Sequence, residues 1–417
     1  MSFETGWQRL TLKQAGVTLI DCDHRTPKAV ADGYPYIAIP QLKDGHIHFH
    51  GVRRISPADF VEWTKKLKPT EHDVVVVRRC SSGDSAVIPA GLNCAIGQNL
   101  VVLRADGTNV HPPFLRWLVR GPDWWEQVNK FINVGAVFDS LKCRDIPNFE
   151  LPIPPIGLQV EISILLKALD DRITLLRETN ATLEAIAQAL FKSWFVDFDP
   201  VRAKAEGRSP DGMDEATAAL FPDGLAESEL GLVPRGWAVG KLEDLLVLQR
   251  GFDLPAADRV PGEFPIIAAS GPAGTHKQAM AKAPGVVTGR SGVLGKVFLE
   301  LEDYWPLNTT LWVKEFRAAS PCYAYEVLKL LDFGSFNAGS AVPTLNRNHV
   351  HSLPYLLPDR ACINAYESLA FVLHKRARGN ERQAQTLATL RDTLLPRLIS
   401  GQLRLADSEP ASVEAPA

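Results

Sequence analysis

Three histidines, His46, His48 and His50, alternate along residues 45–50 and could bind a metal ion. Alternate side chains of a β-strand point to the same face of the sheet, so a strand here would bring all three imidazoles together. Protein zinc sites commonly include cysteine ligands, and no cysteine accompanies these histidines. The pattern therefore favours a solvated or nucleic-acid-facing strand, with a metal site as the alternative.

Two further segments are similar to catalytic motifs but lack residues that those motifs need. His111-Pro112-Pro113-Phe114 is similar to the Asn/Asp-Pro-Pro-Tyr/Phe motif of amino-methyltransferases, whose first side chain accepts a hydrogen bond from the target amine. Histidine performs that task poorly. Residues 289–297 contain glycines as a phosphate-binding loop does, but their spacing differs and Val297 replaces the required hydroxyl. We therefore predict that the chain has no catalytic site, cofactor or metal of its own.

Six cysteines are scattered along the chain without a Cys-x-x-Cys pair. This distribution predicts neither a zinc site nor a disulfide framework, and it agrees with a reducing cytoplasm. No window approaches 18 consecutive apolar residues, and the N-terminus lacks the pattern of a secretory signal. We therefore expect a cytoplasmic protein without a membrane span.

Polar side chains follow buried strands in both halves of the chain and could read DNA. Arginine forks match guanine edges or phosphates, and amides match adenine edges. Because turns always collect polar residues, ordinary turn chemistry remains the alternative. The candidate DNA contacts are Arg78, Arg79, Ser81, Gln98, Arg290, Ser291, Asn308, Thr309 and Arg347.

The elements that carry these residues occur twice. Gly6-Trp7 recurs as Gly236-Trp237, and residues 34–38 resemble residues 264–268. From Leu141 and Leu345 onward the two halves align at a constant offset of 204 residues. Each half reads as short β-rich segments followed by one long helix. The sequence therefore predicts a tandem duplication with an α+β fold.

Both predicted helices carry apolar residues at the 4-3-4-3 spacing of a coiled-coil seam. A helix of more than 35 residues measures roughly 55 Å, too long for either half to bury alone. We therefore expect the two helices to pair antiparallel, with Asn180 and Asn380 fixing the register. Burial of each helix in its own domain is the alternative. The seam and flanking residues assigned to coiled-coil or partner contacts are Leu169, Leu176, Asn180, Leu183, Leu190, Trp194, Asn380, Leu387, Leu394 and Leu398.

The length of 417 residues predicts at least two packed units, and the net charge of −3 conceals an uneven distribution. Residues 156–236 contain 8 Lys and Arg against 14 Asp and Glu, so the acidic excess lies in the middle. The predicted parts are two repeated domains at 1–155 and 237–358, long helices at 156–196 and 359–403, an acidic surface linker at 197–236, and a disordered tail at 404–417.

With repeat, helices and linker together, the chain resembles the specificity subunit of type I DNA restriction-modification enzymes. The resemblance is strongest in the first helix and its continuation, from Leu169-Asp170-Asp171-Arg172-Ile173 to Trp194-Phe195-Val196-Asp197-Phe198-Asp199-Pro200. It continues through Pro234-Arg235-Gly236-Trp237 and Leu394-Leu395-Pro396-Arg397-Leu398-Ile399-Ser400-Gly401. It covers residues 6–403 and is specific in the helical parts.

The resemblance implies two target-recognition domains that each read half of a split, asymmetric site in double-stranded DNA. It also implies two methyltransferase (modification) subunits and, through them, restriction subunits with endonuclease and translocase activity. Adenine-N6 methylation and ATP-dependent cleavage would be theirs, as would the S-adenosylmethionine, ATP and Mg. Two alternatives stay open: a coiled-coil scaffold or adaptor without DNA specificity, and a methyltransferase in its own right.

Overall fold

The computed structural model describes residues 6–133, 139–333 and 344–405. The chain divides into two compact units: unit 1 comprises residues 1–174 and 384–417, and unit 2 comprises residues 175–383. Most of the predicted tail at 404–417 lies outside the described residues. No helix in the described ranges is long and apolar enough to cross a membrane.

Unit 1 contains a four-stranded antiparallel sheet in the order β2-β10-β7-β8. All four residues of β7 are buried, because apolar side chains cover both faces of this strand. The elements of unit 1 before the first long helix are β1 Gln8–Thr11, β2 Val17–Asp21, β3 Tyr34–Ile37, η1 Ile39–Gln41, β4 Leu42–Lys43, β5 His46–Ile47, β6 Arg53–Ile55, α1 Pro57–Trp63, β7 Val74–Val77, β8 Ser85–Val87, β9 Ala95–Ile96, β10 Leu100–Ala105, α2 Pro112–Leu118, α3 Pro122–Phe131, η2 Ile146–Asn148 and β11 Glu150–Ile153.

Unit 2 contains a sheet of the same kind, in the order β15-β21-β18-β19 and also antiparallel throughout. Its elements between the two long helices are α5 Asp199–Ala205, α6 Glu215–Ala219, β12 Leu225–Ser228, β13 Gly231–Pro234, β14 Ala238–Lys241, α7 Leu242–Leu245, β15 Leu246–Arg250, η3 Ala256–Asp258, β16 Phe264–Ala268, β17 Gly271–His276, β18 Gly285–Gly289, β19 Val297–Glu300, β20 Trp305–Pro306, β21 Thr310–Phe316, α8 Pro321–Leu330, α9 Arg347–His351 and β22 Pro354–Leu357.

The smaller sheets repeat as well. In unit 1, β3 pairs antiparallel with β6 and parallel with β9, and in unit 2, β16 pairs antiparallel with β17 and parallel with β20. The terminal pairs β1-β11 and β14-β22 are both antiparallel. Strand order and direction thus agree between the units, and the predicted duplication with an α+β fold is confirmed.

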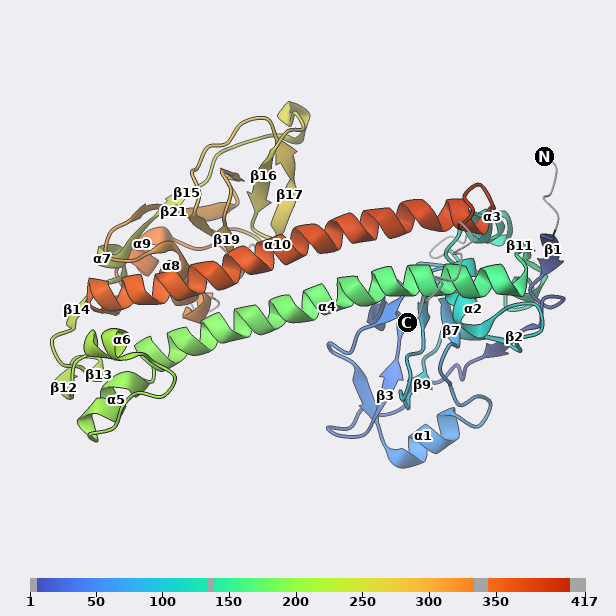
Figure 1. Ribbon diagram of the computed structural model, residues 1–417, viewed down its shortest axis with the longest axis horizontal. Coiled ribbons are helices and arrows are strands. Elements are labelled where there is room, and N and C mark those ends of the chain that lie inside the picture. The colour runs from blue at the N-terminus through green and yellow to red at the C-terminus, as the bar shows by residue number, and fades with distance from the viewer. Residues whose placement is uncertain (1–5, 134–138, 334–343, 406–417) are drawn as a thin grey trace, which may run out of the picture. The chain divides into compact units, whose positions relative to one another are not determined.

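Two 40-residue helices, α4 (Ile156–Phe195) and α10 (Arg360–Ile399), contribute to both units. In unit 2, the Tyr366 hydroxyl donates to the Ala187 carbonyl at 3.2 Å, and Asn180 Nδ2 donates to the Ala377 carbonyl at 2.9 Å. Residue numbers therefore rise along one helix as they fall along the other. The helices lie side by side (Figure 1), and the predicted antiparallel coiled coil is confirmed.

The residues assigned to the seam from their spacing are covered in the structure. Leu176, Trp194, Asn380 and Leu398 are buried, and the other six are half-buried. Leu190 and Trp194 pack with the core of unit 2, and Leu394 and Leu398 pack with the core of unit 1. Their burial supports packing within the chain, and docking of a partner subunit on them stays a prediction.

Asn180 and Asn380 form a direct side-chain contact inside the seam. Asn380 Nδ2 donates to Asn180 Oδ1 at 2.9 Å, and only 3% of the Asn380 surface is exposed. Together with the bond from Asn180 to the Ala377 carbonyl, this contact links the two helices at the observed register. This geometry supports the predicted role in fixing the register.

We expect Asn380→Ala to lower the free energy of unfolding by about 1–3 kcal/mol, because Asn180 Oδ1 loses its donor inside the seam. Chemical denaturation of the full chain measures this loss. Asn364→Ala is the matched control, since Asn364 is exposed on the same helix. Equal stability of the two variants would contradict a structural role for the asparagine pair.

Residues 197–236, expected as a surface linker, are instead folded onto unit 2. The segment forms α5, α6, β12 and β13, and Val201, Phe221 and Val233 join a core that includes Trp194 and Trp237. Its elements are only four to seven residues long, so no periodic pattern develops in the sequence. The expectation of a segment draped over the surface was wrong for this reason.

Candidate nucleic-acid interface

Three strands of unit 1 bring the predicted DNA contacts of the first half to one edge of the sheet. Strand β10 begins where β7 and β2 end, because Leu100 pairs with Val77 and Val101 pairs with Asp21. Arg78 and Arg79 directly follow β7, and Gln98 lies two residues before β10. The backbone N–H of Arg78 donates to the Asn99 carbonyl at 2.8 Å, which joins the two segments.

Unit 2 repeats this edge with the predicted contacts of the second half. Thr310 pairs with Gly289, so β21 begins where β18 ends. The backbone N–H groups of Arg290 and Ser291 donate to the Thr309 carbonyl at 2.8 and 3.1 Å. The arrangement places Arg290, Ser291, Asn308 and Thr309 together, just as Arg78 is joined to Asn99 in unit 1.

A third segment of the chain is hydrogen-bonded to each sheet edge. The segments in the two units are related by the same offset of 204 residues that the sequence shows. The Leu141 N–H donates to the Arg78 carbonyl at 2.9 Å, and the Leu345 N–H donates to the Arg290 carbonyl at 2.8 Å. Leu141 and Leu345 are 204 residues apart, so the repeat extends to single hydrogen bonds. Arg347 follows Leu345 by two residues and begins α9 with its side chain exposed.

Backbone carbonyls hold the arginine of each edge. Nη1 of Arg78 lies 3.5 Å from the Leu141 carbonyl, and Nη1 of Arg290 donates to the Asn308 carbonyl at 2.9 Å. Both residues are half-buried. Each guanidinium is thus held at the backbone through one nitrogen, and Nε of Arg78 is buried without a hydrogen-bond partner among the described residues. Anchoring of this kind reduces the entropy that a bidentate contact would cost.

The amide and hydroxyl candidates differ in how free they are. Nδ2 of Asn308 donates to Asp253, and the Thr309 hydroxyl accepts a hydrogen bond from the Ala269 N–H at 3.3 Å. Ser291 is half-buried. The exposed candidates are Arg79, Ser81, Gln98 and Arg347.

Arg250 lies at the edge of unit 2 and was missed from the sequence. It ends β15, pairs with Leu311 of β21, and leaves 52% of its side chain exposed beside Asp253. In unit 1 the corresponding residue is Asp21, which ends β2 and pairs with Val101. The position of Arg250 at the end of a strand that occurs in both halves could have identified it as a candidate from the sequence.

The predicted three-histidine strand is wrong. Strand β5 ends at Ile47, so His48 and His50 lie beyond it and are exposed. His46 Nε2 instead lies 3.2 Å from Asp170 Oδ2 on α4. Arg116 of α2 and Arg391 of α10 contact the same carboxylate at 2.6 and 2.5 Å. His46 therefore belongs to an ionic cluster that joins four elements of unit 1.

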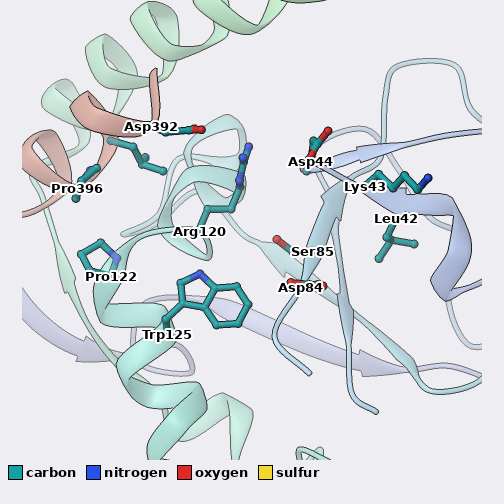
Figure 2. A pocket seen from close by; sticks show the side chains of 12 residues that line it. Leu42, Lys43, Asp44, Asp84, Ser85, Arg120, Pro122, Trp125, Asp392 and Pro396 are labelled. Carbon is teal, nitrogen blue, oxygen red and sulfur yellow. The ribbon is translucent and has the colours of Figure 1, made fainter. Parts of the chain in front are cut away.

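A pocket of about 690 Å³ lies in unit 1, next to β8 and α3. Figure 2 shows Arg120 extending between Asp44 and Asp392, with Trp125 on the other side of the opening. Lys43 and Asp84 also line it. The pocket thus mixes both signs of charge, and none of the predicted DNA contacts lines it. We assign the candidate interface to the two sheet edges and not to this pocket.

Comparison with known proteins agrees with this architecture. The sequence profile of the type I restriction modification DNA specificity domain matches residues 21–185. Over 129 residues, 31% of the chain, the sequence is 38% identical to the type I restriction enzyme HindI specificity subunit of Haemophilus influenzae, and the match spans 28% of that protein.

A longer match covers most of both chains. The MjaIX specificity subunit of Methanocaldococcus jannaschii is 23% identical over 418 aligned residues, which cover 92% of this chain and 87% of that protein. The crystal structure of an S subunit from M. genitalium has the same fold, with a TM-score of 0.60, 16% identity and coverage of 95% and 97% of the two chains. The resemblance to the specificity subunits of type I restriction-modification enzymes, predicted from the motifs, is thereby confirmed.

Proposed function

We propose that this chain is the non-catalytic subunit that reads DNA sequence in a type I restriction-modification complex. One observation supports the proposal most directly: the same sheet edge occurs in unit 1 and in unit 2, but the two edges carry different side chains. Arg78 and Arg290 correspond, whereas Gln98 corresponds to Asn308 and Asp21 to Arg250. Two edges with the same backbone arrangement and different side chains could each recognise one half of a DNA site whose two halves differ in sequence.

The proposed partners are double-stranded DNA, two modification subunits and, through them, restriction subunits, in the cytoplasm of the cell. S-adenosylmethionine, ATP and Mg would bind to those subunits, which would methylate adenine N6 and cleave DNA. Methylome sequencing of cells that carry this subunit with its modification partner tests the proposal. A methylated motif made of two half-sites and an unread spacer is the expected result.

A coiled-coil scaffold without DNA specificity is the competing function. A gel shift with the purified modification complex separates the two, because a scaffold would leave the retardation of DNA independent of its sequence. A methyltransferase in its own right would bind S-adenosylmethionine without a partner. We expect no such binding by this chain, and isothermal titration calorimetry measures it.

We expect Arg290→Ala to relax one half-site and to leave the other intact. A lost bidentate base contact costs about 1–3 kcal/mol, or roughly 5- to 150-fold in affinity for that half-site. Arg78→Ala should relax the opposite half-site. Methylome sequencing of both variants measures the effect position by position. If either variant relaxed both half-sites equally, the assignment of one half-site to each unit would be wrong.

Two control variants distinguish a loss of base recognition from a loss of the folded structure. Arg290→Lys keeps the positive charge but loses the planar fork, so it should bind DNA while losing base preference. Arg235→Ala removes an exposed arginine whose ion pair with Asp223, at 3.5 Å, lies outside both sheet edges. A modification complex that contains this variant should methylate the wild-type motif.

A further inference from the structure

Three side chains that can bind a metal ion meet at the end of β2 in unit 1. The ligand atoms of Asp21, Cys22 and His24 all lie within 4.8 Å of one another, and these three residues are named the β2 cluster. His24 Nε2 lies 3.1 Å from Asp21 Oδ2. The other carboxylate oxygen, Asp21 Oδ1, is buried and has no hydrogen-bond partner among the described residues. The cluster therefore contains an acceptor that nothing in this part of the chain satisfies.

The surroundings of Cys22 suit a metal-bound thiolate. The backbone N–H of Leu100, the first residue of β10, lies close enough to the Cys22 thiol to lower its pKa, although burial raises that pKa by more. Such N–H donors are the outer contacts that tune metal-bound sulfur. A second cysteine, Cys143, lies near enough to Asp21 for the Asp21 charge to raise the pKa of its thiol, which burial raises most. The cluster thus offers three ligand atoms of different chemistry: a carboxylate oxygen, a thiol sulfur and an imidazole nitrogen.

The donor set selects the kind of ion. Thiolate, imidazole and carboxylate together are characteristic of zinc and its first-row neighbours, whereas Mg and Ca prefer oxygen ligands alone. Zinc bonds of about 2.0–2.3 Å in a tetrahedral site place ligand atoms about 3.3–3.8 Å apart. The observed upper limit of 4.8 Å is close enough for small side-chain rotations to close the site.

The local charge permits a divalent cation despite a neighbouring arginine. The Arg78 guanidinium is near enough to act on both Cys22 and Cys143. One divalent ion, one thiolate and one carboxylate sum to zero charge, so the loaded site would not repel Arg78.

We propose that Asp21, Cys22 and His24 form a structural binding site for zinc or a neighbouring first-row divalent ion. The site closes the segment after β2 onto the sheet edge that carries Arg78, because Asp21 pairs with Val101 at that edge. The ion supplies a structural link and takes no part in methyl transfer. The scattered cysteines hid this site, since its ligands follow an Asp-Cys-x-His order without a Cys-x-x-Cys pair.

Cobalt substitution of the full chain tests the site directly. The purified protein is treated with EDTA and titrated with Co²⁺, and the near-ultraviolet and visible spectra are recorded. The expected result is a thiolate-to-cobalt charge-transfer band with tetrahedral d–d bands, which saturate at one equivalent and disappear when Zn²⁺ is added. Absence of a saturable charge-transfer band would overturn the proposal.

Variants identify the ligands. Cys22→Ser should abolish the charge-transfer band, and His24→Gln should weaken Co²⁺ binding by about tenfold or more. The matched controls are Cys80→Ser and His48→Gln, because both residues are exposed in unit 1 outside the β2 cluster. A charge-transfer band that survives in Cys22→Ser or is lost in Cys80→Ser would place the metal elsewhere and refute the site.

The unfolding temperature, measured with and without Zn²⁺, distinguishes loss of the metal site from loss of the fold. Zn²⁺ should raise the unfolding temperature of the wild-type chain and of Cys80→Ser, but not that of Cys22→Ser. Equal stabilisation of Cys22→Ser by Zn²⁺ would count against the site. Both measurements use the chain without DNA or partner subunits, so their outcome is independent of the proposed function.

Discussion

Replacing Asp170 with asparagine is expected to lower the free energy of unfolding by about 3–5 kcal/mol, because the change leaves buried arginines without their counter-charge. Only 2% of the Asp170 side chain is exposed. Its two oxygens bind Arg116 at 2.6 Å and Arg391 at 2.5 Å, and the latter side chain is 9% exposed. Asp170 therefore joins α4, α2 and α10 within unit 1 through one carboxylate.

Asp171→Asn is the matched control for this prediction. Asp171 is the next residue of α4, is 62% exposed, and forms an ion pair with Lys167 one turn away. An exposed pair of this kind contributes about 0.3–0.5 kcal/mol. Urea denaturation of both variants gives the comparison. A loss for Asp170→Asn as small as that for Asp171→Asn would show that the cluster does not stabilise the fold.

The pH dependence of this effect has a definite sign. Burial alone would raise the pKa of Asp170, but the hydrogen bond to His46 and the charges of Arg116 and Arg391 outweigh it and hold the pKa well below the usual range. The stabilisation is therefore complete above the unfolded pKa of about 3.9 and is lost as the pH falls through the lower folded pKa. The difference between wild type and Asp170→Asn should shrink in strong acid.

Lengthening both long helices by one heptad should lengthen the unread spacer of the DNA site. Seven residues inserted after Leu176 and seven after Asn380 preserve the 3.5-residue period and add about 10 Å to the helix pair. At about 1.7 Å of axis per DNA charge, or 3.4 Å per base pair, that is about three base pairs. Methylome sequencing should show the same half-sites with the longer gap.

The structure supports these two insertion points as a matched pair. Asn380 contacts Asn180, and Leu176 lies one turn before Asn180, so both insertions enter the seam beside the asparagine contact. The same insertion turns the half-sites by nearly a third of a turn, which the DNA must absorb by twisting or bending. If methylation were retained and the unread spacer kept its original length, helix length would not set the distance between the two half-sites.

A single insertion is the control for the double one. Seven residues added after Leu176 alone put α4 one heptad out of register with α10 on one side of the insertion, so either the Asn180–Asn380 contact or the Asp170–Arg391 contact is lost. This variant should lose stability or methylation altogether. Methylation with the original spacing would mean that the rest of the fold, and not the seam, sets the distance.

The sequence by itself determined the features that repeat over short intervals along the chain. The 4-3-4-3 spacing located Leu176, Leu398 and the other covered residues of α4 and α10, because an α-helix returns to the same face every 3.6 residues. The offset of 204 residues predicted the duplication that the two matching sheets confirm. The motifs around Trp194 and Pro396 identified the family resemblance.

Tertiary structure decided which distant side chains meet. Arg391 of α10 binds Asp170 of α4, which lies 221 residues away in the sequence. His46, which its spacing placed on one strand face with His48 and His50, instead lies 3.2 Å from the same carboxylate, 124 positions away in the sequence. The periodicity of the sequence could not predict these contacts. Which buried charges pair with one another depends on the path of the folded chain and not on the spacing of residues along it.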